Sequence, residues 1–99
     1  MPTASADTAI LLHLTVRIPA AGVSEFRAYE DRVLPLLAEH GGTLERRLRS
    51  ADGTVEVHIV HFASQENYGR FRNDPRRATA AHLMAASGAV VELIEMHNV

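Results

Sequence analysis

The chain has 99 residues, a formal net charge of −2 and no cysteine. A single domain of this length can bury a core but has little room for an enclosed pocket of its own, so a site shared with a second copy is expected. A net negative charge gives no basic surface for binding nucleic acid. The lack of cysteine excludes disulfides and thiolate catalysis. All ten basic residues are arginine, which also excludes lysine Schiff-base chemistry.

Two parts of the chain bear on domain organisation and location. Residues 1–8 are small and polar, and they are predicted to form a disordered tail before a single domain at residues 9–99. No apolar run approaches the roughly 20 residues that a membrane span needs. The expected protein is therefore cytoplasmic, with no membrane and no nucleic acid among its partners.

The first half of the domain predicts a strand followed by a helix. Residues 9–18 alternate, with aliphatic side chains at the even positions and His13, Thr15 and Arg17 at the odd ones. A helix is expected over residues 24–40, with Ser24 as its N-cap and Pro35 splitting its last turns. Two glycines at 41–42 should end it.

The second half predicts a hairpin, a broken helix and a last strand. Residues 43–49 alternate imperfectly, as on an edge strand or one with a bulge, and a turn at 51–53 leads into a strand at 54–62. In that strand the odd positions, beginning with Val55, are expected to face the core, so Glu56 and His58 should face away from it. Helical segments over residues 64–73 and 75–87, the second capped by Asp74, precede a strand at 90–97.

The element order strand, helix, strand, strand, helix, strand predicts an α+β, ferredoxin-like βαββαβ fold. In this fold a four-stranded antiparallel sheet carries two helices on one face, and the first and third strands are central neighbours. His13 and His58 should then lie together on the open face of the sheet, with Leu11, Val60 and Phe62. Because that face is half apolar, two copies are expected to pack sheet to sheet and close a barrel-like homodimer.

Two segments resemble the dimeric α/β-barrel superfamily: residues 29–42, with their Gly-Gly stop, and residues 60–75, with the third strand and broken helix. The similarity is to its small members, the DUF1330-type and antibiotic biosynthesis monooxygenase-like proteins. It implies a homodimer with a ligand cavity between sheet and helices or inside the barrel. The superfamily includes cofactor-independent monooxygenases, isomerases, cyclases and haem-degrading enzymes. The chain departs from the monooxygenases and the haem degraders in having no tryptophan.

Histidines are the leading candidates for catalysis. Neutral imidazole can take and return a proton near physiological pH, so His13 and His58 are predicted to act on a carbon acid or phenol. Arg17 could hold the resulting anion, and Glu56 could orient a histidine. The alternative is that these polar groups satisfy one another at a dimer interface. A bulge near Phe62 would exchange the roles of His58 and His61, and both orientations stay open.

The remaining candidates concern substrate binding. They are Glu56, Phe62, Tyr68 and His82, together with Arg49, which should face the open side with His13. His58 and His61 are three apart, so on a strand they face opposite sides and make a poor metal pair. No metal and no cofactor are expected.

Three functions follow as hypotheses. The first is a cofactor-independent isomerase or cyclase that acts on a small aromatic or enolisable substrate by histidine acid–base chemistry. The second is a cofactor-free monooxygenase of the same fold. The third is a non-catalytic dimeric protein that binds a ligand or serves an accessory role.

Overall fold

The computed structural model describes residues 8–99, so the predicted tail at residues 1–8 lies, apart from Thr8, outside the described part. The elements in chain order are β1 (Ile10–Arg17), the 3-10 turn η1 (Ala20–Gly22), α1 (Val23–Val33), α2 (Leu36–Glu39), β2 (Gly42–Arg49), β3 (Val55–Phe62), α3 (Gln65–Arg72), α4 (Pro75–Ser87) and β4 (Val90–Met96).

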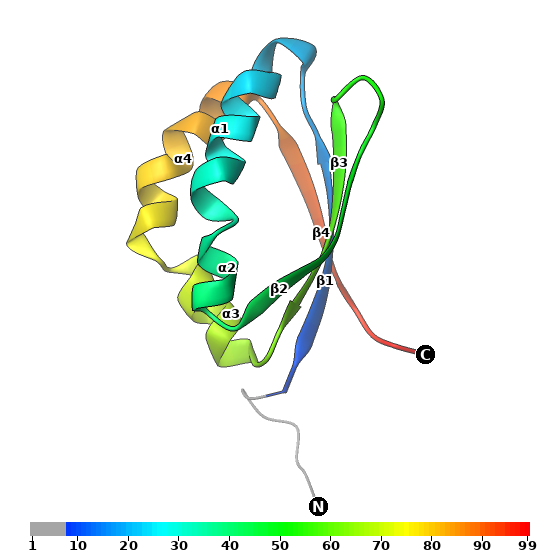
Figure 1. The fold of residues 1–99 in the computed structure, drawn as a ribbon, viewed down its shortest axis with the longest axis vertical. Helices are drawn as coiled ribbons and strands as arrows, with labels where there is room; N and C mark the ends of the chain where they lie inside the picture. Colours follow the sequence, from blue (N-terminus) through cyan, green and yellow to red (C-terminus); the bar gives the residue numbers. More distant parts are fainter. Residues whose placement is uncertain (1–7) are drawn as a thin grey trace, which may run out of the picture.

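The strands form one antiparallel sheet in the order β2-β3-β1-β4, with β1 and β3 in the centre. The helices lie together on one side of this sheet, and no described helix or strand covers its other side (Figure 1). This is the predicted ferredoxin-like βαββαβ architecture. In the described residues no helix has the length and apolar character of a membrane span.

The helical segments break where the sequence predicts. Pro35 separates α1 from α2, and Asp74 caps α4 by accepting a hydrogen bond from the Arg76 amide at 2.9 Å. The predicted start at Ser24 is wrong: α1 begins at Val23, and its N-cap is Gly22. Gly22 stands there because α1 and α4 approach closely, and a Cβ at this position would overlap the Ser87 carbonyl.

The hairpin between β2 and β3 also matches the expectation. The register of β2 is irregular between Leu44 and Arg46, which confirms the predicted bulge. In the turn, the Asp52 carboxylate accepts hydrogen bonds from the Ser50 hydroxyl at 2.8 Å and the Thr54 amide at 3.0 Å. Gly53 takes a positive φ of 78°. The bulge shifts which side chains of β2 face the helices.

The orientation predicted for β3 is wrong. Its register pairs Leu14 with His58 and Val16 with Glu56, so these polar residues share the helix-covered face with the aliphatic residues of β1. Val57 and Ile59 face the open side instead. The residues of β3 do alternate, but both faces of the strand carry apolar residues. The hydrophobic pattern alone therefore does not identify which face meets the helices.

His13 and His58 consequently lie on opposite faces of the sheet. The partner of His13 on β3 is Ile59, on the open face, where His61 also lies. The predicted convergence of His13 with His58 on one face is therefore wrong. Val60 and Phe62, expected on the open face, are buried in the core at 5% and 1% exposure.

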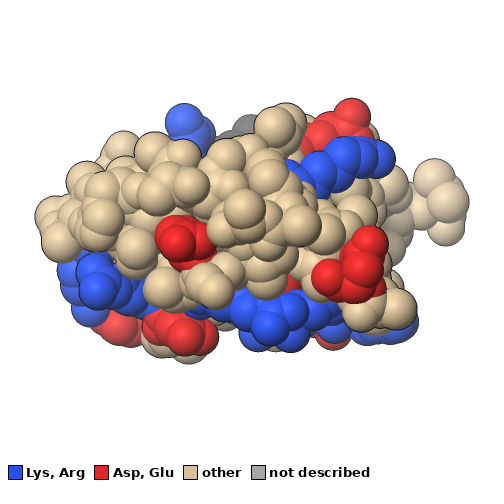
Figure 2. Space-filling model, turned by 90° about the horizontal axis from the view of Figure 1, so that it is seen from above, with Lys and Arg blue, Asp and Glu red and all other residues tan. Residues whose placement is uncertain are grey.

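The face viewed in Figure 2 carries no large patch of only positive or only negative charge. Arginines and carboxylates lie there among other residues. The open face of the sheet is different, because large apolar side chains of β2 and β4 are exposed there. Leu48 is 48% exposed, and Ile94 and Met96 are each 44% exposed. Their strand partners are Val57, His13 and Leu11, which places all three side chains on the uncovered face.

Candidate functional site

A cavity of about 330 Å³ lies between the sheet and the helices. Its walls are mostly apolar: β1, β3 and β4 contribute aliphatic side chains, and the helices contribute aromatic ones. Tyr68 and Phe62 stand against each other in this wall, with ring centroids 5.1 Å apart. Its size and lining are typical of a site for a small organic molecule.

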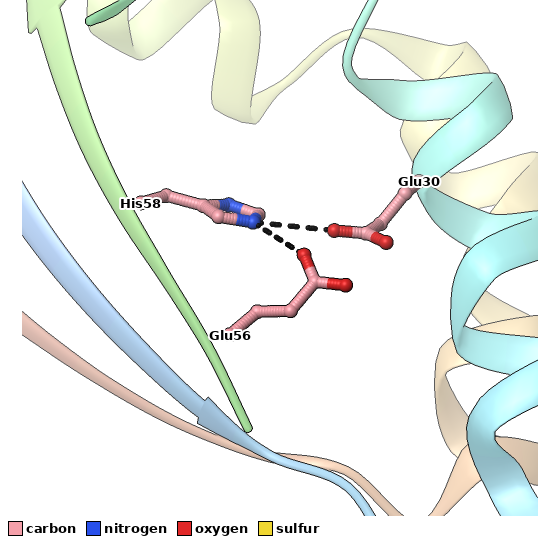
Figure 3. A group of neighbouring side chains, drawn as sticks. All are labelled: Glu30, Glu56 and His58. Carbon is pink, nitrogen blue, oxygen red and sulfur yellow. Dashed lines mark hydrogen bonds and ion pairs between the residues drawn. The ribbon is translucent and has the colours of Figure 1, made fainter. Parts of the chain in front are cut away.

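Glu30 and His58 are the polar groups at the inner wall of this cavity. His58 Nε2 lies 2.9 Å from Glu56 Oε1 and 3.2 Å from Glu30 Oε2. Figure 3 shows the three side chains pointing toward one another, Glu30 from α1 and the other two from β3. All three are buried. Three ionisable groups in contact in a protein interior require compensation, since each would otherwise be costly to bury.

Two arginines of β2 supply that compensation. Arg49 Nε donates to Glu56 Oε2 at 2.9 Å, and Arg47 Nη2 donates to Glu30 Oε1 at 2.9 Å. Arg47 Nε also reaches Glu56 Oε1 at 3.4 Å. The guanidinium groups approach from the edge strand, where they stay partly in water. The prediction that Arg49 faces the open side with His13 is wrong, because the bulge and the orientation of β3 turn it toward the helices.

The cluster separates the pKa values of its members. Burial raises the pKa of Glu30, and its hydrogen bond with His58 offsets this only in part. Burial on its own would raise the pKa of Glu56. The hydrogen bonds that Glu56 makes and the charge of Arg47 outweigh this effect and hold its pKa well below the usual range. For His58, the hydrogen bonds to both carboxylates outweigh burial and raise the pKa. His58 thus lies beside the anionic carboxylate of Glu56 and the carboxyl group of Glu30, whose neutral form is favoured. A histidine between two such groups is suited to proton transfer.

The same three residues could offer ligands to a metal, since their donor atoms lie within 4.8 Å of one another. However, Arg47 and Arg49 already place two positive charges on the two carboxylates. A divalent cation would add to this charge rather than balance it, so the donor set fits a proton better than a metal ion.

Other residues predicted for the site lie elsewhere. Arg17 is exposed at the end of β1, where it pairs with Val55 on the open face and does not reach the cavity. His82 is exposed on α4, and its Nδ1 lies 3.0 Å from the Thr79 carbonyl of the same helix. Neither is among the residues that line the cavity. His13 is half-buried on the open face, away from the cluster.

The structure brings together Glu56, His58 and Arg49, with Phe62 and Tyr68 on the same cavity wall. Glu30 was missed from the sequence. One signal could have identified it: Glu30 lies four residues after Phe26 and three before Val33, so it occupies a core position of α1. A carboxylate there needs buried partners, and β3 provides them.

Comparison with solved structures identifies the fold. The chain is similar to SnoaB, a cofactor-independent oxygenase from Streptomyces nogalater, at 17% identity and a TM-score of 0.76 over 93% of this chain and 94% of that one. It is also similar to Rv0793 from Mycobacterium tuberculosis, at 19% identity and a TM-score of 0.74 over 93% and 96%.

A third similar structure comes from Caulobacter crescentus CB15 and is provisionally named an antibiotic biosynthesis monooxygenase. It shares 15% identity and a TM-score of 0.72, over 94% of this chain and 93% of the other. No family model and no curated protein matches the sequence. The chain thus has the ferredoxin-like fold of antibiotic biosynthesis monooxygenase-like proteins, as the resemblance in residues 29–42 and 60–75 implied.

Proposed function

We propose that the protein is an enzyme that moves a proton on a small aromatic or enolisable molecule held between the sheet and the helices. One observation carries the proposal: His58 is buried between two carboxylates on the wall of a mostly apolar cavity. Apolar walls suit a ring system, and a histidine held in this way is suited to act as its acid or base. The reaction uses side chains alone, and no cofactor is proposed.

The contacts of the imidazole define its role. Nε2 is engaged by Glu56 and Glu30, whereas Nδ1 makes no hydrogen bond to any described residue. In the neutral imidazole with its proton on Nε2, toward the carboxylates, Nδ1 can accept a proton from a substrate hydroxyl or C–H, and anionic Glu56 stabilises the imidazolium that forms. If the same proton returns to a different carbon of the resulting enolate, the substrate is isomerised. If the enolate carbon attacks a carbonyl carbon of the same molecule, the proton goes to the new alkoxide and a ring closes.

Cofactor-free oxygenation is the second candidate, favoured by the structural similarity to SnoaB. It begins with the same removal of a proton, but the carbanion then reacts with molecular oxygen. One oxygen atom stays on the substrate carbon and the other leaves as water, so the organic substrate supplies the electrons. The two reactions share His58 and differ in whether oxygen is consumed.

Incubation with 1,3-dihydroxynaphthalene in D₂O tests the proposal, because its keto tautomer exposes exchangeable ring C–H bonds. We expect the protein to accelerate deuterium incorporation, and His58→Gln to lose about 10²-fold or more of that rate. His97→Gln, in the exposed segment after β4, is the matched control and should keep the rate. Oxygen uptake measured in parallel would assign the monooxygenase reaction. Binding of the diol with no exchange and no uptake would assign a non-catalytic binding protein and refute the enzyme.

We also propose that two copies pair through the open face of the sheet. The exposed Leu48, Ile94 and Met96 support this, because an apolar sheet face in water is unfavourable. Sedimentation velocity at micromolar concentration should give a dimer, and Ile94→Arg should give a monomer because it places a charge on that apolar face. A wild-type monomer would contradict the pairing.

A further inference from the structure

We propose that Arg72 and Arg77 form a receptor for an anionic group at the mouth of the cavity, so that an aromatic or enolisable acid is preferred as substrate over its neutral analogue. This rests on the proposed function, because it names the class of substrate for the same cavity. Both arginines line the cavity and also the open groove outside it, between α1 and α4. They stand where a ligand would enter.

Arg77 is held in place by its neighbours. Its guanidinium carbon lies 4.7 Å from the centroid of the Phe71 ring, and Nη2 donates to the Tyr29 hydroxyl at 3.3 Å. Nη1 lies 3.4 Å from the Arg72 carbonyl. Its Nε is buried and has no hydrogen-bond partner among residues 8–99. A buried donor without a partner is costly, and an acceptor on a bound ligand would relieve that cost.

Arg72 flanks the same entrance, with its guanidinium carbon 5.3 Å from the centroid of the Tyr68 ring. Both guanidinium groups lie over aromatic rings, and these contacts orient their donors at the entrance. Such a pair suits bidentate recognition of a carboxylate, an enolate or a phenolate.

The carboxylates near the cavity are already bound to other groups. Glu30 and Glu56 contact Arg47 and Arg49 of the edge strand β2. Asp74, which borders the outer groove, contacts Arg76 and His40. No described carboxylate lies within ion-pair distance of Arg72 or Arg77, so their positive charge at the mouth is not offset by a direct contact.

This charge distribution fixes the direction in which a ligand binds. At the inner wall, the carboxylates of Glu30 and Glu56 already occupy Arg47 and Arg49, whereas the two arginines at the mouth have no carboxylate within ion-pair distance among the described residues. A substrate would place its anionic group between Arg72 and Arg77 and its reactive ring toward His58. The arginines are thus specificity residues, while His58 moves the proton.

Direct binding measurements separate this inference from the proposed chemistry. The probes are 2-naphthoate and 2-naphthamide, which match in shape but differ in charge, titrated by calorimetry at pH 7. We expect the wild type to bind the naphthoate about tenfold more tightly, and Arg77→Gln to abolish that preference while it keeps the amide affinity. Arg70→Gln is the matched control, since Arg70 pairs with Glu66 on the outside of α3. It should keep the preference.

Equal affinities for the two probes, no binding of either, or a preference that survives Arg77→Gln would overturn the inference. His58→Gln should keep the preference, because the anion binds at the mouth. If His58→Gln retains full exchange activity while the preference for naphthoate stands, the proposed chemistry fails and the anion site remains.

Discussion

Replacement of Glu56 by glutamine tests the energetics of the buried cluster. The substitution preserves shape but removes the charge that His58, Arg47 and Arg49 contact, and the new amide nitrogen faces their donors. The contact with His58 is fully buried, so its loss should cost about 2 kcal/mol. Arg47 and Arg49 are 37% and 38% exposed and can turn to water, so each adds only about 0.5 kcal/mol.

The expected loss in the free energy of unfolding is thus about 3 kcal/mol. With a urea m-value of roughly 1.5 kcal/mol per M, the unfolding midpoint should fall by about 2 M. Glu66→Gln removes the same charge from an exposed ion pair on α3 and should cost less than about 0.5 kcal/mol. Urea unfolding followed by circular dichroism at one fixed protein concentration measures both. A loss for Glu56→Gln no larger than that for Glu66→Gln would refute the account of the cluster.

Two further predictions concern Glu30 and the contact between η1 and α4. Because the pKa of Glu30 is raised in the folded state, wild-type stability should fall as pH rises from about 4.5 through that raised pKa, and Glu30→Gln should lack this component. Urea midpoints of both proteins from pH 4 to pH 8 would show a difference that grows in favour of the variant; a constant difference would contradict it. Gly22→Ala should destabilise by more than about 2 kcal/mol, because its Cβ would overlap the Ser87 carbonyl. Gly69→Ala, in an open position of α3, should stabilise the protein by about 0.5–1 kcal/mol. Equal effects of the two substitutions on the melting temperature would contradict the close contact between Gly22 and Ser87.

The order of elements was predictable because local signals mark each boundary. Pro35 and Asp74 interrupt or start helices by backbone chemistry that does not depend on the rest of the fold. The bulge in β2 and the turn at Asp52 were likewise visible as a broken alternation and a turn sequence. From these, the four-stranded sheet with helices on one face followed by topology rules.

The site was only partly predictable, because it depends on which face of β3 meets the helices. The alternation of Val55, Val57 and Ile59 with Glu56 and His58 identifies two faces but not their environments. A face with a glutamate and a histidine was interpreted as open, yet these groups are buried because β2 and α1 supply their partners. Those partners are far apart in sequence, so their meeting is a property of the tertiary structure.

The central claim is that a small aromatic molecule binds between the sheet and the helices, beside His58, and not on the open face of the sheet. Intermolecular nuclear Overhauser effects from the ring protons of 1,3-dihydroxynaphthalene to labelled methyl groups test it most directly. The account predicts contacts to Leu12 and Val60, which line the cavity. Contacts to Ile59 and Ile94, on the uncovered face, would contradict it.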